Sequence, residues 1–333
     1  MQQNVLIAEQ NSHLKNNAKI VLNANAKRNK VIWRFSDNRA GHDSQSIGLV
    51  SALQDRVDCE VYNIDVPFPL SSYASAVLKK LPLVSHYPDP DLLVGAGHTS
   101  HFPMLASRLL RGGRALVIMT PTLPTQLFDF CLIPEHDNKQ RSSNIIPTTG
   151  PLNTIRTSNQ LSITDGLILL GGESKHFYWN EDKLFGQIAE ITKHDKRNWV
   201  ITDSPRTPTS TEEILRSLNQ ENVEYISFRQ NNGADLSTFL QKAGNVWVSE
   251  DSMSMIYEAL STGASVGLLQ TDEKPKSRLG KVAQSLAEKK LLTVFDEWQS
   301  SQQLLPPSRI LSESTRCADL LVERLGWERK ETV

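Results

Sequence analysis

The residues best suited to chemistry lie in short polar loops that follow apolar runs. The first loop comes after the run VIWRF and holds Asp37, Arg39 and His42 within six positions. Gly41 permits a tight turn among them, because glycine adopts backbone conformations that other residues avoid. A plain turn would need the glycine but neither the guanidinium nor the imidazole. We therefore expect these side chains to face a substrate.

A second loop, GAGHTSH, holds His98 and His101 after the run DLLV. Its glycines allow close approach to a ligand, and a helix starting there presents free N–H groups. The two histidines are three positions apart and would share one face of that helix. A single histidine is more often structural, so only the pair, together with His42, favours a substrate site. A metal site is not expected, because no carboxylate or cysteine lies at ligand spacing nearby.

The third loop, GGESK, places Gly171 and Gly172 just before Ser174 and Lys175. This order is typical of a loop that cradles a diphosphate, although a glycine turn with exposed charges explains it equally well. The GxxxxGK[ST] spacing of an ATP-binding loop is missing. A further loop, DSPRTP, mounts Arg206 rigidly between prolines, where it either binds an anion or lies in a plain surface loop.

The segment SEDSMSMIYEALSTG is the most informative part of the second half. Ile256 and Leu260 follow helical spacing and should face a core. Ser252 is suited to cap the start of this helix, so free N–H groups would point at a bound anion. Ser254 and Glu258 share another face. The pattern predicts a nucleotide site, with phosphates at the helix start and ribose hydroxyls on Glu258; a solvated glutamate is the simpler alternative.

Strands alternating with helices must position these loops, which indicates an α/β protein with mostly parallel sheets. A polar stretch near 150–164 separates two Rossmann-like domains, 31–155 and 156–333, after a poorly ordered extension, 1–30. Ligands of such sheets bind beyond the carboxyl ends of the strands, so the loops should line a cleft between the domains. The predicted strands are 31–35, 59–64, 91–97, 115–120, 128–134, 166–172, 198–203, 223–228, 245–251 and 264–269. The predicted helices are 43–55, 100–111, 180–193, 210–220, 235–243, 252–262 and 276–290.

Composition narrows the classes of function. The chain of 333 residues has 36 basic and 37 acidic side chains, so its net charge of −1 does not predict nucleic-acid binding. Cys59, Cys131 and Cys317 lie far apart without CxxC spacing. That argues against a disulfide framework or a zinc site and fits a reducing cytoplasm. The longest apolar runs have the length of strands, which predicts no transmembrane helix.

Seven segments resemble, in order, the motifs of the mitochondrial-fission-ELM-type family: SDNRAGH, GAGHTSHFP, PTLPTQLFDFCLIPEHD, TTGPLN, GGESKHFYW, DSPRTP and SEDSMSMIYEALSTG. The resemblance covers roughly residues 31–290. Bacterial members are regarded as candidate glycosyltransferases, some tied to assembly of the lipopolysaccharide or lipooligosaccharide core. The plant member that names the family is linked to mitochondrial division. Asn38 replaces a glycine of the family's usual SDGRAGH, and asparagine tolerates the left-handed backbone of such a turn.

The resemblance implies a GT-B-like fold, with the acceptor mostly on the first domain and a nucleotide-sugar donor mostly on the second. The reaction implied is transfer of a sugar from a UDP- or CMP-sugar to a cell-envelope glycolipid or oligosaccharide, with no further cofactor. The residues expected at the acceptor are Arg39, Gly41 and His101. Those expected at the nucleotide and its phosphates are Gly171, Gly172, Ser174, Lys175, Arg206, Asp251, Ser252, Ser254 and Glu258.

The catalytic groups follow from the same hypothesis. No DxD-like metal motif follows a predicted strand, so helix N-termini, Lys175 and Arg206 are expected to stabilise the leaving group. An acceptor hydroxyl needs a base within hydrogen-bond reach. His42 is the first choice for an inverting reaction because an imidazole titrates near neutral pH, and Asp37 and His98 are the alternatives.

A retaining reaction would instead favour Glu250 or Asp251. Glu250 and Glu258 also match the E-x7-E spacing of some retaining GT-B enzymes. Two other functions stay open: a nucleotide-sugar epimerase, which needs no acceptor, and a non-catalytic interaction protein at a membrane, which needs no nucleotide. The expected location is the cytoplasm, with peripheral contact to the inner membrane through the helix that carries Leu109, Leu110 and three arginines.

Overall fold

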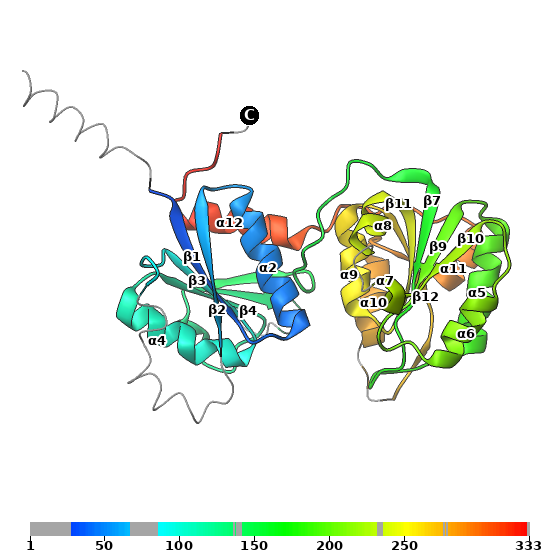
Figure 1. Ribbon diagram of the computed structural model, residues 1–333, viewed down its shortest axis with the longest axis horizontal. Coiled ribbons are helices and arrows are strands. Elements are labelled where there is room, and N and C mark those ends of the chain that lie inside the picture. Colours follow the sequence, from blue (N-terminus) through cyan, green and yellow to red (C-terminus); the bar gives the residue numbers. More distant parts are fainter. Residues whose placement is uncertain are drawn as a thin grey trace, which may run out of the picture.

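The computed structural model describes residues 28–66, 86–135, 137, 142–231, 236–275, 277 and 279–331. These residues form two α/β units, side by side in Figure 1, each built on a six-stranded parallel sheet. The predicted α/β class with two Rossmann-like sheets is thus confirmed. Of the predicted extension, 1–30, residues 1–27 lie outside the described part of the chain.

The first unit has the strand order β2-β1-β3-β4-β5-β6. Along β1, Val31, Trp33 and Phe35 pack on one side of the sheet while Ile32 packs on the other, as the two-residue period of a strand requires. Helix α4 covers the first side, and α2 covers the second. The elements are β1 (Lys30–Ser36), α2 (Ala40–Gln54), β2 (Cys59–Asp65), β3 (Leu92–Ala96), η3 (His98–Ser100), α4 (His101–Arg111), β4 (Arg114–Ile118), η4 (Thr125–Leu127), β5 (Phe130–Pro134) and β6 (Ile145–Thr148).

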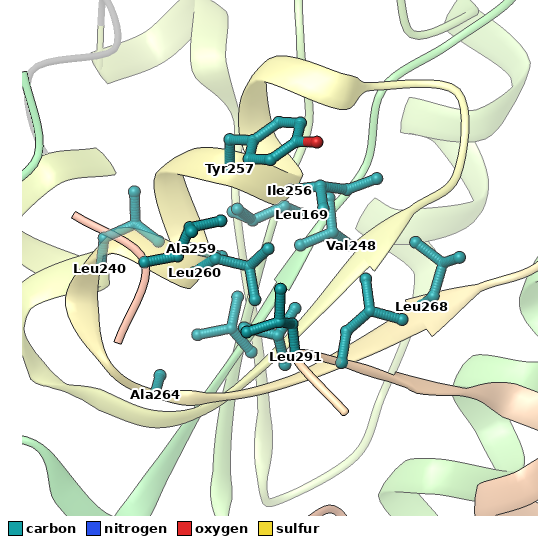
Figure 2. Packing of buried hydrophobic residues seen from close by; sticks show 14 of the residues in the cluster. Leu169, Leu240, Val248, Ile256, Tyr257, Ala259, Leu260, Ala264, Leu268 and Leu291 are labelled. Atoms are coloured by element: carbon teal, nitrogen blue, oxygen red, sulfur yellow. The ribbon is translucent and has the colours of Figure 1, made fainter. Parts of the chain in front are cut away.

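The second unit has the order β10-β9-β7-β11-β12-β14, with a short antiparallel pair, β8 and β13, beside it. Figure 2 shows Ile256, Ala259 and Leu260 of α9 packed with Leu169 and Val248 of the sheet. The elements are β7 (Ser162–Leu169), β8 (Phe177–Tyr178), α5 (Glu181–His194), β9 (Asn198–Thr202), α6 (Thr209–Ser217), β10 (Val223–Ile226), α7 (Phe228–Asn231), α8 (Leu236–Lys242), β11 (Ala243–Ser249), α9 (Met253–Thr262), β12 (Ser265–Leu269), β13 (Asp272–Glu273), α10 (Leu279–Glu288), β14 (Thr293–Val294) and α11 (Phe295–Ser301).

The strand orders fix where ligands can enter each sheet. The order in which successive strands join the sheet reverses between β1 and β3 in the first sheet and between β7 and β11 in the second. The crevice at such a switch point, beyond the carboxyl ends of the strands, is where open α/β sheets bind ligands. The SDNRAGH and GAGHTSH loops follow β1 and β3, and the GGESK and SEDSM loops follow β7 and β11. All four predicted loops therefore lie at the two switch points.

The end of the chain returns to the first unit. Helix α12 (Glu313–Leu325) packs against α2, and its Cys317 and Leu321 belong to the same core cluster as Leu49 and Leu53. Figure 1 shows α12 beside α2, away from the second sheet. The predicted second domain, 156–333, is therefore wrong at its end: helical periodicity shows that α12 has a buried face but not which surface covers it.

Removing a side chain from α12 should destabilise the first unit. Leu321 is fully buried beneath α2, so we expect Leu321→Ala to lower the free energy of unfolding by about 2–5 kcal/mol through lost burial and the cavity left behind. Leu109→Ala is the matched control, because Leu109 is 86% exposed. It should change stability by about 0.5 kcal/mol or less. Equal effects in urea denaturation would contradict this packing.

Candidate functional site

The side chain of Asp37 is fully buried at the end of β1 and binds His42. His42 Nδ1 lies 2.9 Å from Asp37 Oδ2, and the Thr99 hydroxyl donates to the same oxygen at 2.6 Å. Burial alone would raise the pKa of Asp37, but hydrogen bonds from Thr99 and His42 outweigh it and hold that pKa below its ordinary value. An ionised Asp37 keeps the proton on His42 Nδ1 and leaves Nε2 as the basic atom. Asp37 thus orients His42 and does not itself face a substrate.

The GAGHTSH loop supports this pair through its backbone. Gly97 has φ +77°, and a Cβ at this position would lie 2.2 Å from His42 Cε1. Only glycine allows the imidazole to pack this closely against the end of β3. Thr99, one of the hydrogen-bond donors to Asp37, comes from the same loop and is not among the predicted site residues. Its place in the second polar loop was the available signal.

The two histidines of this loop do not share a ligand-facing side, contrary to expectation. His98 is exposed at the start of η3, whereas His101 is buried and packs edge-on against Phe128. Burial lowers the pKa of His101 to about 4, so its ring is neutral near pH 7. Its Nδ1 lies 3.4 Å from the Thr122 hydroxyl. His101 thus supports the loop after β4 from within the core.

Hydrogen bonds from neighbouring side chains fix the turn between β1 and α2. Asn38 has φ +57°, the left-handed conformation expected of it. Buried Arg34 donates to Asp43 Oδ1 at 2.7 Å, and the Ser36 hydroxyl donates to the same oxygen at 2.6 Å. The side chain of Arg39 stays half-exposed, with Nε 3.8 Å from Asp37. Of the charged groups in this turn, Arg39 is therefore the one placed to meet an anionic ligand.

A second buried carboxylate, Asp251, organises the loops of the other unit. Its side chain is fully buried and accepts hydrogen bonds from the Gly172 N–H at 3.0 Å, the Ser249 hydroxyl at 2.7 Å and Arg206 Nη2 at 2.8 Å. The Gly171 N–H donates to the Ser249 hydroxyl at 2.8 Å. Both glycine amides are thus already used, so the expected phosphate cradle at Gly171 and Gly172 is wrong for this pair. A Cβ at Gly171 would lie 2.2 Å from Asp251, which explains the small residue.

The rest of the GGESK loop leads into the short strand β8, which pairs with β13, and not directly into a helix. The Ser174 hydroxyl accepts the backbone N–H groups of His176 and Phe177, at 3.2 and 3.1 Å. Helix α5 begins only at Glu181, with Asn180 as its N-cap. Lys175 is exposed and makes no hydrogen bond or ion pair with the residues that the structure describes. It is the cation of this loop that remains available to a ligand.

Helix α9 offers both an anion-binding end and an unusual carboxylate. Ser252 occupies the N-cap position, as predicted, but its side chain makes no capping hydrogen bond. The first backbone N–H groups of the helix can therefore donate to a ligand. Ser254 is exposed in the first turn. Burial raises the pKa of Glu258 from 4.5 to about 7. No hydrogen bond or ion pair joins Glu258 to the described residues, which suits a carboxylate that receives hydroxyl groups.

Glu250, the other half of the E-x7-E spacing, lies differently. Its pKa is also raised, mainly by burial, while the Thr271 N–H at 3.4 Å partly offsets this effect. That contact directs Glu250 toward the segment after β12. Glu250 does not line the cavity that contains Glu258. The two glutamates therefore do not line the same cavity.

The two units meet at a cavity of about 360 Å³. Gly41 from the start of α2 and Glu258 from α9 both line it, so residues predicted separately as acceptor-binding and nucleotide-binding share one space. The connection between the units forms a third wall. The full lining is Ala40, Gly41, Ser44, Gln45, Pro151, Leu152, Asn153, Ser254 and Glu258.

The described residues contain neither a metal-ligand cluster nor a membrane-spanning helix. No group of three or more His, Cys, Asp and Glu side chains in this part of the chain is arranged to hold a metal ion. Nor is any helix there long and apolar enough to cross a membrane.

The family is established by comparison with known sequences. A model of the family described as mitochondrial fission ELM1 matches residues 40–325. The chain belongs to this family. The chain is also similar in sequence to an uncharacterized protein of Rickettsia prowazekii. The two are 22% identical, and the match covers 80% of this chain and 90% of that protein.

Solved structures share the fold of this ELM1 family member at low identity. A UDP-GlcNAc 2-epimerase of Neisseria meningitidis, bound to UDP-GlcNAc, has a TM-score of 0.54 and 14% identity over 88% of this chain and all of that one. MurG of Acinetobacter baumannii has a TM-score of 0.50 and 12% identity over 89% and 99%. The glycotransferase of kitacinnamycin has a TM-score of 0.52 and 13% identity over 89% and 99%. These likenesses confirm the GT-B-like fold.

Glu258 should make stability depend on pH in a specific direction. The folded protein binds the Glu258 proton more tightly than the unfolded chain, so stability falls as pH rises from 4.5 to about 7. Glu258→Gln removes this loss. The stability of the variant relative to wild type should therefore rise across this window, by at most about 1.4 kcal/mol per pH unit, and then level off.

Urea denaturation at several pH values measures this difference. Glu323→Gln, on the exposed side of α12, is the matched control for loss of one carboxylate. Its difference from wild type should be small throughout. If the Glu258→Gln and wild-type curves run parallel between pH 4.5 and 7, burial does not perturb this carboxyl group.

Proposed function

We propose that the protein transfers a sugar from a nucleotide-activated donor to a cell-envelope glycolipid or oligosaccharide. The observation that carries this proposal is the shared cavity: the start of α2 and the Glu258 face of α9 line one space between the units. His42 and its orienting carboxylate stand at the switch point of the first sheet, and α9 begins at that of the second. Acid–base groups on one side and an anion-binding helix end on the other suit a two-substrate reaction.

On the donor side, the diphosphate would meet the N–H groups of the first turn of α9, beside Ser252 and Ser254. Glu258 lies one helical turn beyond Ser254 and would accept the ribose hydroxyls. Lys175 supplies a mobile positive charge toward the leaving diphosphate. Arg206 has less freedom, since it already donates to Asp251 and to the Gly172 carbonyl at 3.0 Å. It contributes mainly by holding the loops in place.

On the acceptor side, His42 Nε2 takes the proton of the acceptor hydroxyl. The hydroxyl oxygen then forms the new bond to the anomeric carbon of the sugar. The bond between that carbon and the phosphate oxygen breaks, and its electrons leave with the nucleotide. Asp37 stabilises the positive charge that develops on His42. This sequence is an inverting displacement, in which Glu250 has no direct part.

We also propose that the first unit touches a membrane peripherally. The outer side of α4 exposes Leu109 and Leu110, which are 86% and 52% accessible. Arg108 and Arg111 lie in the same last turn, although each already pairs with an aspartate. Exposed leucines beside cationic side chains suit the interface of an anionic membrane. Such contact would present a lipid-linked acceptor to the first unit.

Nucleotide binding is the first test. Isothermal titration of UDP, UMP, CMP and GDP should find one nucleotide that binds the wild type. Glu258→Ala should weaken it about 10- to 100-fold, the effect of losing hydrogen bonds to a charged acceptor. Glu323→Ala, on the far surface of α12, serves as the control and should bind like wild type. If the wild type binds none of the four nucleotides, the transferase proposal fails and the non-catalytic alternative gains.

His42→Ala should separate chemistry from binding. We expect nucleotide release from UDP- and CMP-sugars, supplied with cell-envelope glycolipid extract, to fall about 10²- to 10⁴-fold. Nucleotide affinity should stay within about threefold, because His42 does not line the donor wall. Full activity in this variant would show that the SDNRAGH loop is a structural turn without a catalytic role. Conversion of a nucleotide sugar to its epimer without extract would favour the epimerase alternative.

A further inference from the structure

A second cavity lies outside the site described above, along the first sheet from Thr120 after β4 to Ile145 at the start of β6. Its volume is about 520 Å³. The loop between β4 and β5 supplies most of its wall, and Ile133 and Ile145 supply apolar side chains from the sheet. We call it the threonine groove. The lining residues are Thr120, Pro121, Thr122, Leu123, Pro124, Thr125, Gln126, Ile133, Asp137 and Ile145.

The strand register places this groove close to the Asp37–His42 pair. Ala96, the last residue of β3, pairs with Ile118, the last residue of β4, so these two strands end side by side. Strand β5 continues two residues past Leu132, the partner of Ile118, to Pro134. His42 packs against Gly97, the residue that follows β3. Since neighbouring strands are about 4.8 Å apart, Thr120, which lines the groove two residues after β4, lies about one strand spacing along the edge from the end of β3, where His42 packs. One or two sugar rings would span that distance.

The chemistry of the lining fits a sugar. The hydroxyl groups of Thr120, Thr122 and Thr125 and the amide of Gln126 offer both donors and acceptors at the mouth. Leu123 and the isoleucine side chains offer apolar surface to the carbon face of a ring. A few placed polar groups on an apolar wall are typical of small-molecule sites. Asp137 is the one charged side chain among the lining residues that the structure describes, and the hydroxyl and amide groups around it favour a ligand rich in hydroxyl groups.

The loop that forms the groove is held in one conformation. Met119, just after β4, has φ +75°, an uncommon backbone conformation for a residue other than glycine. Asn144 donates to the carbonyl oxygens of Thr125 and Phe128 at 2.8 and 3.0 Å. The neutral ring of His101 supports Thr122 from the core. Local strain and support from buried side chains are typical of loops whose shape matters for a ligand.

We propose that the threonine groove binds the sugar of the acceptor next to the one that receives the new bond. The acceptor would then carry at least two sugar rings, with the reacting hydroxyl at His42 and the neighbouring ring in the groove beside Thr120 and Thr122. His101 is a positioning residue in this arrangement, acting through Thr122. The inference rests on the proposed transferase function and names the class of its acceptor.

A glycan array tests the groove directly. Labelled protein is applied, with and without UDP or CMP, to mono-, di- and trisaccharides printed both free of lipid and as alkyl glycosides. The wild type should retain di- and trisaccharides at least tenfold better than monosaccharides. Thr120→Trp, an exposed position whose indole would fill the groove, should remove this binding. Gln126→Ala should weaken it several-fold. Ile163→Trp, at an 83% exposed position on β7 of the second unit, adds similar bulk outside the groove and should bind like wild type.

The outcomes separate this inference from the transferase proposal. Thermal unfolding verifies that each variant is folded, and nucleotide titration verifies the donor side. If Thr120→Trp binds the array like wild type, or if the wild type retains no oligosaccharide while still binding nucleotide, the groove is not an acceptor subsite. Absence of nucleotide binding counts instead against the transferase. Stronger retention of alkyl glycosides than of free glycans would identify a lipid-linked source of the same sugar.

Discussion

Two buried carboxylates, Asp37 and Asp251, hold the loops of both units in place. A buried charge costs several kcal/mol unless it gathers hydrogen-bond donors, so each carboxylate fixes the segments that supply them. Asp37 binds the start of α2 to the loop after β3, through His42 and Thr99. Asp251 binds the loops after β7 and β9, through Gly172 and Arg206. Both lie at a switch point, where a parallel sheet exposes loops to a ligand. The fold thus uses its buried charges to position chemistry rather than to perform it.

Glu258 is the opposite case, and the contrast identifies the ligand-facing wall. Asp251 is surrounded by donors, whereas Glu258 has none among the described residues and lines the cavity between the units. Desolvation without compensation explains why the pKa of Glu258 rises to about 7, while the hydrogen bonds around Asp37 lower its pKa. Carboxyl groups whose environments push their pKa values apart mark different roles in a site. A group that lacks protein partners is ready to receive them from a ligand.

The sequence predicted the central strands and the four polar loops, because these strands are buried on both faces and appear as continuous apolar runs. Two edge strands were not predicted, because β6 is only four residues long and contains Pro147, and β14 has only two residues. The loop chemistry was harder to assign. A pattern of GG followed by SK cannot tell whether the glycine N–H groups meet a phosphate or Asp251, about 80 residues away in the chain. The burial of His101 was equally hidden, since spacing within a helix does not reveal which side meets the core.

The connection between the units supplies Asn153 to the lining of the cavity, and the same residue joins α9 to α12. Its side chain donates to the Ser261 hydroxyl of α9 at 3.0 Å, and its carbonyl accepts the hydroxyl of Ser314, in α12, at 2.7 Å. The two chain crossings between the units therefore meet at one residue, which also lines the cavity. Domain motions are absorbed by a few residues at such connections. Widening the space between α2 and α9 would therefore strain or break these hydrogen bonds. The TTGPLN motif, which contains Asn153, thus limits how far the site can open.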